Sequence, residues 1–109
     1  MKHKACRIVV LISGSGTNLQ ALIDAIDQGQ IAGKIVTVIS NRPDAAGLKR
    51  AENAGISTLV IDHHQFSSRE LFDSEVLQQL RDCRPDLVVL AGFMRILSPE
   101  LVEHFAGKM

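Results

Sequence analysis

The sequence lacks an excess of either charge: its 109 residues include 12 basic and 12 acidic side chains, which gives a formal net charge of zero. Proteins that bind nucleic acid or anionic membranes over a broad surface carry a basic excess, so this balance argues against both classes. It still permits a local pocket for one anion. No apolar run approaches the roughly 20 residues that a membrane-spanning helix needs. A chain of this length suits one domain, residues 1–109, with a single core.

Cysteine is also scarce, and the two residues present, Cys6 and Cys83, lie in or beside apolar segments without metal-ligand spacing. This pattern favours reduced, packed thiols in a cytoplasmic protein, and a Cys6–Cys83 disulfide is the alternative. No group of histidines, cysteines and acidic residues shows the spacing of metal ligands, and no nucleophile elbow is present, so we expect no metal. His63 and His64 are expected to be surface or packing residues.

Four short runs rich in valine, isoleucine and leucine alternate with helical patterns. The runs occupy residues 7–13, 34–40, 57–62 and 85–92. They mostly lack apolar–polar alternation, which is typical of strands covered on both faces in a parallel sheet. Apolar spacing and end signals predict helices over residues 17–28, 45–54, 68–83 and 99–106. For the third helix, Ser67 is the expected cap, with Glu70 closing a capping box.

This alternation predicts a Rossmann-like α/β fold, with a parallel sheet and helices on both faces. Short connections and right-handed crossovers favour the strand order 3-2-1-4, in which the fourth strand returns to the other side of the first. Open α/β sheets bind ligands where the winding direction reverses, outside the carboxyl ends of the strands. We therefore expect a crevice between the segments that follow the first and fourth strands.

The first of these segments reads Gly14-Ser15-Gly16-Thr17-Asn18. Gly14 and Gly16 permit positive φ and a close approach of a ligand to the backbone. Thr17 and Asn18 lie at the start of a helix, where free N–H groups and the helix dipole favour an anion such as phosphate. The alternative is a plain strand–helix turn in which Thr17 is an ordinary N-cap.

The same segment matches dinucleotide-binding motifs poorly. The third glycine of the Gly-x-Gly-x-x-Gly fingerprint would fall at Leu19, and the second strand ends without an acidic residue for a ribose. Arg42 could accept the additional phosphate of NADP, which keeps an NADP-dependent oxidoreductase domain as a weaker alternative. The Walker ending Gly-Lys-Ser/Thr is absent.

The segment after the fourth strand, residues 92–97, is unusually apolar for a loop and carries Arg95 among apolar side chains. Its backbone groups could read the edge of a flat heterocycle while its side chains cover the two faces. Alternatively, these side chains simply pack beneath the last helix.

Three stretches, taken in order, resemble one family, the glycinamide ribonucleotide formyltransferases of purine biosynthesis. They are RIVVLISGSGTNLQALID, SNRPDAAGLKRAENAGI and PDLVVLAGFMRILSPELVEHFAGKM, and the resemblance covers essentially the whole chain. It implies the formyltransferase fold and transfer of a formyl group from 10-formyltetrahydrofolate to the amine of glycinamide ribonucleotide. These two small molecules would be the partners, with no nucleic acid, membrane or metal involved.

The resemblance also implies roles for individual residues. Those expected to bind the ribonucleotide phosphate or to border that substrate are Gly16, Thr17, Asn18, Gly92 and Met94. Those expected to bind the folate are Arg69, Leu90, Met94, Arg95, Ile96, Leu97 and Val102, with Arg69 at the benzoylglutamate end. Ser15 and Thr17 stand where many relatives have Asn and Ser, and neither departure removes the glycine or the hydroxyl.

The family's catalytic residues are expected beyond this sequence. In the family, an Asn-x-His-Pro motif and a later Asp follow the stretch that ends here at Met109, so residues 1–109 contain none of them. We expect the amino-terminal half of such an enzyme, without turnover alone. Its fourth strand should expose an apolar edge that pairs with a second copy or with a complementing carboxyl-terminal fragment. A non-catalytic nucleotide- or phosphate-binding module is the alternative.

Overall fold

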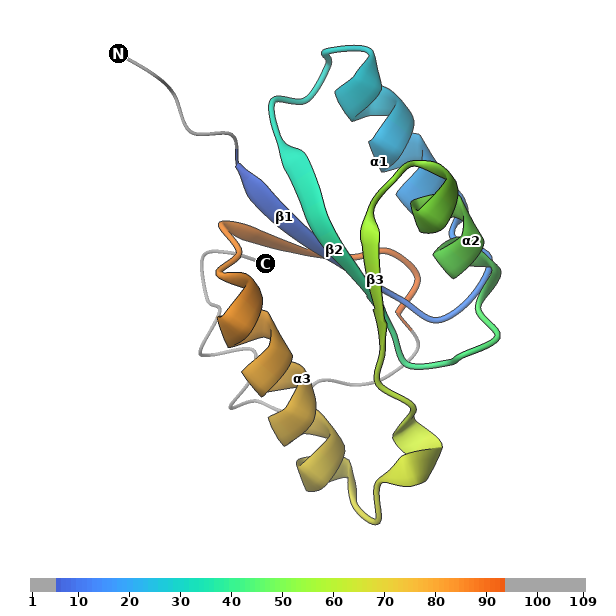
Figure 1. Cartoon of the computed structure of the whole chain (residues 1–109), viewed down its shortest axis with the longest axis vertical. Coiled ribbons are helices and arrows are strands. Elements are labelled where there is room, and N and C mark those ends of the chain that lie inside the picture. Colours follow the sequence, from blue (N-terminus) through green and yellow to red (C-terminus); the bar gives the residue numbers. More distant parts are fainter. Residues whose placement is uncertain (1–5, 94–109) are drawn as a thin grey trace.

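The structure is a computed structural model and describes residues 6–93, in which one parallel sheet organises the chain (Figure 1). The strands lie in the order β3-β2-β1-β4, and every pair is parallel. This confirms the predicted order 3-2-1-4. The predicted fourth helix lies outside the described residues. The elements are β1 (Arg7–Ile12), α1 (Thr17–Asp27), β2 (Lys34–Ser40), α2 (Ala46–Asn53), β3 (Ser57–Val60), the 3₁₀ helix η1 (His63–Gln65), α3 (Arg69–Cys83) and β4 (Leu87–Leu90).

Helices cover both faces of the sheet, with α1 and α2 on one face and α3 on the other (Figure 1). The side chains of the central strand β1 alternate between two hydrophobic clusters. Ile8, Val10 and Ile12 join the cluster that contains α1 and α2. Val9 and Leu11 join the cluster that contains α3. Both faces of β1 are therefore buried, and each buried aliphatic side chain stabilises the fold by roughly 2 kcal/mol. Apolar residues on both faces explain why the sequence of β1 does not alternate between apolar and polar residues.

The register of the strands brings their carboxyl ends to one edge of the sheet. Ile12 of β1 lies opposite Ser40 of β2, and Leu11 of β1 lies opposite Leu90 of β4. The segments that follow these three strands therefore meet at the same edge, as the strand order predicts.

The start of α3 differs from the sequence prediction by one residue. Ser68 is the N-cap, because its Oγ accepts a hydrogen bond from the backbone N–H of Leu71 at 3.1 Å. The expected cap at Ser67, with Glu70 closing a capping box, is wrong. Two adjacent serines have equal capping chemistry. Packing decides between them: Phe66 contacts Phe72 edge-on across the start of the helix, with ring centroids 5.8 Å apart.

A short 3₁₀ turn, η1, precedes this helix and is capped by Asp62. Oδ1 of Asp62 accepts a hydrogen bond from the backbone N–H of His64 at 3.0 Å. This hydrogen bond lowers the pKa of the Asp62 carboxyl below its ordinary value. The carboxylate is thereby fixed at the carboxyl end of β3.

Two further features bear on the sequence predictions. Cys6 and Cys83 are free and half-buried, and Sγ of Cys83 donates to Oγ1 of Thr37 over 3.7 Å. Within residues 6–93, no helix combines the length and apolar character needed to cross a bilayer.

Candidate functional site

The chain leaves β1 and enters α1 through a tight turn at Gly16, the N-cap of the helix, which has φ 76° and ψ 24°. No side chain caps this end of α1 among the described residues, so its first N–H groups can bind a ligand. The alternative in which Thr17 is an ordinary N-cap is therefore wrong, because Thr17 is the first helical residue. Gly14 has no positive φ; only the second glycine needs its conformational freedom.

A pocket of about 330 Å³ opens in front of this helix end. It is formed by the segments that follow β1, β2 and β4, as the predicted crevice requires. Four of the predicted ribonucleotide-binding residues line it together: Gly16, Thr17, Asn18 and Gly92. The other lining residues are Ser13, Gly14, Ser15, Arg42 and Ala91.

Helix α2 holds this turn in place through Gly47. The backbone N–H of Gly47 donates to the carbonyl oxygen of Gly14 at 2.9 Å. A Cβ on Gly47 would lie 2.6 Å from Cδ1 of Ile12 and 3.0 Å from Cα of Gly16, so no side chain fits between the two backbones. Arg50, one turn further along α2, donates from Nε to the carbonyl oxygen of Ser15 at 2.8 Å.

Sequence reasoning missed both of these α2 residues. The signal for Gly47 was a glycine inside a helix, which costs about 1 kcal/mol relative to alanine and therefore suggests a close approach of another backbone. No comparable signal marks Arg50, because an arginine on a helix surface is ordinary.

The floor of the pocket is polar and buried. Oγ of Ser13 donates to Oδ1 of Asn41 at 2.6 Å, and both residues are 2% exposed. Nδ2 of Asn41 lies 3.3 Å from Nδ1 of His63, whose ring stands edge-on to Phe72. His63 is thus a packing residue, as expected, but it also supports the residues beneath the crevice.

The charges around the pocket favour an anion. Arg42 is the only charged residue among the nine described residues that line it. Its guanidinium forms an exposed ion pair with Asp44, with Nε 3.3 Å from Oδ1. An exposed pair of this kind is weak, roughly 0–1 kcal/mol, so the guanidinium can turn toward a bound anion. The positive end of the α1 dipole acts in the same direction.

The family model described as formyl transferase matches residues 6–109. The chain belongs to the formyl transferase family. The strand order and the placement of a pocket beside the Gly16 turn agree with the fold that the sequence resemblance implied.

Relatives within the formyl transferase family are similar over nearly the whole chain. The phosphoribosylglycinamide formyltransferase of Escherichia coli (strain K12) is 53% identical over 102 residues, which make up 94% of this chain and 48% of that protein. The trifunctional purine biosynthetic protein adenosine-3 of Homo sapiens is 49% identical over 108 residues, 99% of this chain and 11% of that protein.

Solved structures give the same result for the fold. The structure of the phosphoribosylglycinamide formyltransferase from Coxiella burnetii in complex with CHES matches with a TM-score of 0.93 and 52% identity, over 97% of this chain and 50% of that chain. The glycinamide ribonucleotide transformylase 1 structure from Symbiobacterium toebii matches with a TM-score of 0.90 and 44% identity. The chain spans about half the length of these bacterial relatives.

The residues expected to bind folate are only partly described. Arg69 is the first residue of α3 and is exposed. Leu90 ends β4 and is 48% exposed. Neither side chain lines the pocket at Gly16. The remaining candidates lie outside the described residues: Met94, Arg95, Ile96, Leu97 and Val102.

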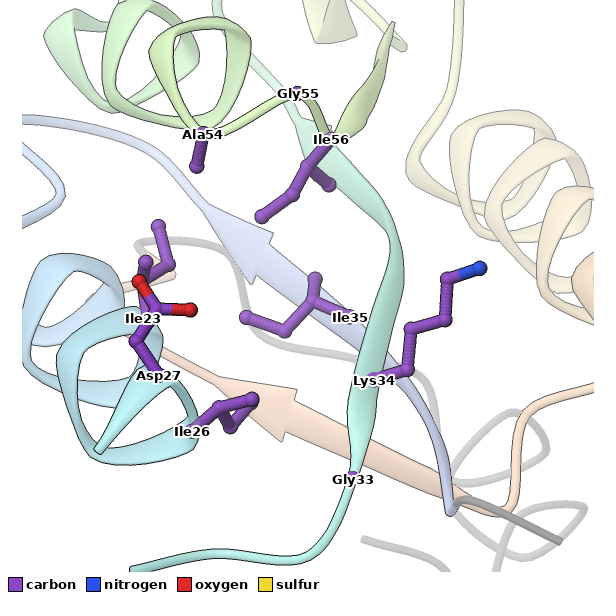
Figure 2. A pocket seen from close by; sticks show the side chains of 9 residues that line it. All are labelled: Ile23, Ile26, Asp27, Gly33, Lys34, Ile35, Ala54, Gly55 and Ile56. Carbon is purple, nitrogen blue, oxygen red and sulfur yellow. The ribbon is translucent and has the colours of Figure 1, made fainter. Parts of the chain in front are cut away.

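A second pocket, of about 210 Å³, lies at the opposite edge of the sheet, between the ends of α1 and α2 and the start of β2 (Figure 2). Most of its lining residues are apolar, and the Lys34 side chain points away from the other labelled side chains (Figure 2). Helix carboxyl ends carry partial negative charge, so this pocket disfavours anions. Its lining residues are Ile23, Ile26, Asp27, Gly33, Lys34, Ile35, Ala54, Gly55 and Ile56.

Proposed function

We propose that residues 1–109 form the nucleotide- and folate-binding half of a phosphoribosylglycinamide formyltransferase, in which the pocket at Gly16 binds the phosphate of glycinamide ribonucleotide. The observation that carries this proposal is the uncapped start of α1 facing a pocket that also contains Arg42. A phosphate there accepts hydrogen bonds from backbone N–H groups and meets the positive end of the helix dipole. The hydroxyl of Thr17 and the amide of Asn18 add further donors.

The reaction proposed for the complete enzyme is transfer of a formyl group from 10-formyltetrahydrofolate to the substrate amine. The 109 residues contain none of the catalytic residues that the family resemblance implies. Polarising the formyl carbonyl and moving protons both require such groups. We therefore propose binding, not turnover, as the activity of this chain alone, with the catalytic groups supplied by a carboxyl-terminal half.

The described part of the proposed folate site fits an apolar ring. Leu90 stands half-exposed at the carboxyl end of β4, and Ala91 and Gly92, which follow it directly, line the phosphate pocket. A folate ring held beside Leu90 would therefore lie next to the bound ribonucleotide. When bound, 10-formyltetrahydrofolate would supply the formyl group. Arg69 would hold its carboxylate end through a charge-assisted hydrogen bond.

A further part of the proposal concerns β4, the outermost strand on one side of the sheet. Within the described residues, β4 pairs with β1 alone, so its other edge is open. An open apolar edge pairs readily with another strand. We propose that a complementing carboxyl-terminal fragment or a second copy occupies it. Light scattering of the isolated chain checks self-association, and a monodisperse monomer at high concentration would exclude the second copy.

Calorimetric titration with two matched ligands tests the phosphate assignment. Glycinamide ribonucleotide should bind the chain at least about tenfold more tightly than glycinamide ribonucleoside, which differs only in lacking the phosphate. Equal affinities, or no binding of either ligand, would contradict the proposal. NADP serves as a third ligand: tighter binding of NADP would favour the dinucleotide alternative instead.

A further inference from the structure

Asp62, His63 and His64 form a compact cluster of donor atoms at the carboxyl end of β3, outside the crevice. One carboxylate oxygen and one nitrogen from each imidazole all lie within 4.8 Å of one another. Three consecutive residues do not show the usual spacing of metal ligands, so the sequence prediction passed over them. The 3₁₀ turn η1 is what brings their side chains together.

Hydrogen bonds to one oxygen hold the carboxylate of this cluster in position. Oδ1 of Asp62 accepts from the backbone N–H of His64 at 3.0 Å and lies 3.2 Å from Nδ1 of the same residue. Among the described residues, both hydrogen bonds of this carboxylate fall on Oδ1. Oδ2 is therefore available to a cation.

The ring of His63 is also fixed before any ligand binds. Its Nδ1 lies 3.1 Å from the carbonyl oxygen and 3.3 Å from Nδ2 of Asn41, which is buried. On its other side the ring stands edge-on to Phe72 at a centroid distance of 6.4 Å. The ring of His64 lies against it, with the two centroids 4.0 Å apart. Ligands whose orientation is already set lose less entropy on binding a metal.

From this geometry we infer that Asp62, His63 and His64 bind one divalent first-row transition ion, with Zn²⁺ as the representative. Two imidazole nitrogens and one carboxylate oxygen form a donor set that suits Zn²⁺ and its neighbours. Mg²⁺ and Ca²⁺ prefer an all-oxygen environment. Three protein ligands leave the remaining coordination positions to water. None of the three ligands lines the pocket at Gly16, although His63 contacts Asn41 beneath it.

Calorimetric titration of the untagged, reduced chain with Zn²⁺ alone tests this inference. His64→Ala removes a ring whose side chain is 76% exposed, so the variant should fold normally, as circular dichroism can verify. Asp62→Asn keeps an oxygen to cap η1 but removes the charge. Each change should weaken Zn²⁺ binding by at least about tenfold. Gln65→Ala, an exposed neighbour on the same turn, is the matched control and should leave the affinity unchanged.

Two further measurements test which ligands hold the metal. Mg²⁺ should bind far more weakly than Zn²⁺, and the absorption spectrum with Co²⁺ should lack thiolate-to-metal charge transfer, because no cysteine belongs to the cluster. The inference is overturned if His64→Ala and Asp62→Asn bind Zn²⁺ as tightly as the parent chain. Thiolate-to-metal charge transfer that persists in the Co²⁺ spectrum of His64→Ala would also overturn it, because the bound metal would then lie on a cysteine.

Discussion

The sheet carries pockets of different chemistry at the edge where its strands end, here called the carboxyl edge, and at the edge where they begin, the amino edge. At the carboxyl edge, the start of α1 faces a cavity of about 330 Å³ lined by glycines, hydroxyl side chains and Arg42. At the amino edge, the ends of α1 and α2 face a cavity of about 210 Å³ whose nine lining residues include four isoleucines and Asp27. The same helix thus presents its positive end to one pocket and its negative end to the other. Helix direction in a parallel α/β fold decides which pocket suits an anion.

Both edges contain glycines in the left-handed conformation, and one from each edge, Gly16 and Gly55, differ in their surroundings. Gly16 has φ 76° and Gly55 has φ 74°. A Cβ on Gly16 would lie 2.5 Å from Cα of Gly47, whereas a Cβ on Gly55 would meet nothing within 4 Å. The backbone conformation alone therefore does not mark the site. The packing of two backbones against each other does.

The largest expected effect comes from substituting these two glycines in parallel. Gly16→Ala should lower the free energy of unfolding by about 2–4 kcal/mol, because left-handed strain and a clash with backbone atoms add together. Gly55→Ala carries the strain alone and should cost about 1–2 kcal/mol. Urea denaturation monitored by circular dichroism measures both. Equal losses would show that the contact between Gly16 and Gly47 contributes nothing.

A smaller loss of stability is expected at the floor of the crevice. Asn41→Ala removes a buried amide whose Oδ1 accepts from Oγ of Ser13 at 2.6 Å and whose Nδ2 lies 3.3 Å from Nδ1 of His63. The cost should be about 2 kcal/mol. Asn53→Ala, at the exposed end of α2 near the amino edge, should change stability by less than about 0.5 kcal/mol. If the two asparagine variants unfold at the same urea concentration, the polar floor is not a structural element of the site.

Removing one cationic side chain at each edge should show which pocket binds the ribonucleotide. Arg42→Ala should weaken glycinamide ribonucleotide binding by about tenfold, roughly the value of one charge-assisted hydrogen bond. Lys34→Ala should leave the affinity unchanged, since its side chain belongs to the other edge and points away from the other side chains labelled in Figure 2. Calorimetric titration gives both values. A comparable loss in both variants would indicate a general charge effect rather than a contact with the phosphate.

The sequence predicted the sheet order and the meeting of Gly16, Thr17, Asn18 and Gly92 because both depend on regular features. Apolar runs without alternation indicate buried parallel strands, and the strand order then fixes which loops meet. The cap of α3 was misplaced by one residue, because the choice between adjacent serines depends on the packing of Phe66 against Phe72.

Contacts between distant segments could not be predicted in the same way. The role of Gly47 depends on a close approach to Gly16, thirty-one residues earlier in the sequence, and only the packing of α2 on the turn creates it. The hydrogen bond from Arg50 to Ser15 has the same origin. Residues that support a site from a neighbouring helix leave little local pattern, so their identification requires the folded arrangement.

The smallest expected effect concerns the dipole of α1. This helix has no basic residue in its last turn and ends in Asp27, an unfavourable charge at a negative helix end. Asp27→Lys should therefore raise the free energy of unfolding by about 0.5 kcal/mol, with Asp27→Asn between the two. Urea denaturation in low salt measures the gain, which should shrink in about 1 M salt because of screening. Binding of glycinamide ribonucleotide should not change, since the substitution lies at the far end of the helix. A gain in stability accompanied by altered ribonucleotide affinity would show that the charge at one end of α1 is felt at the other, and the two edges would then no longer be independent.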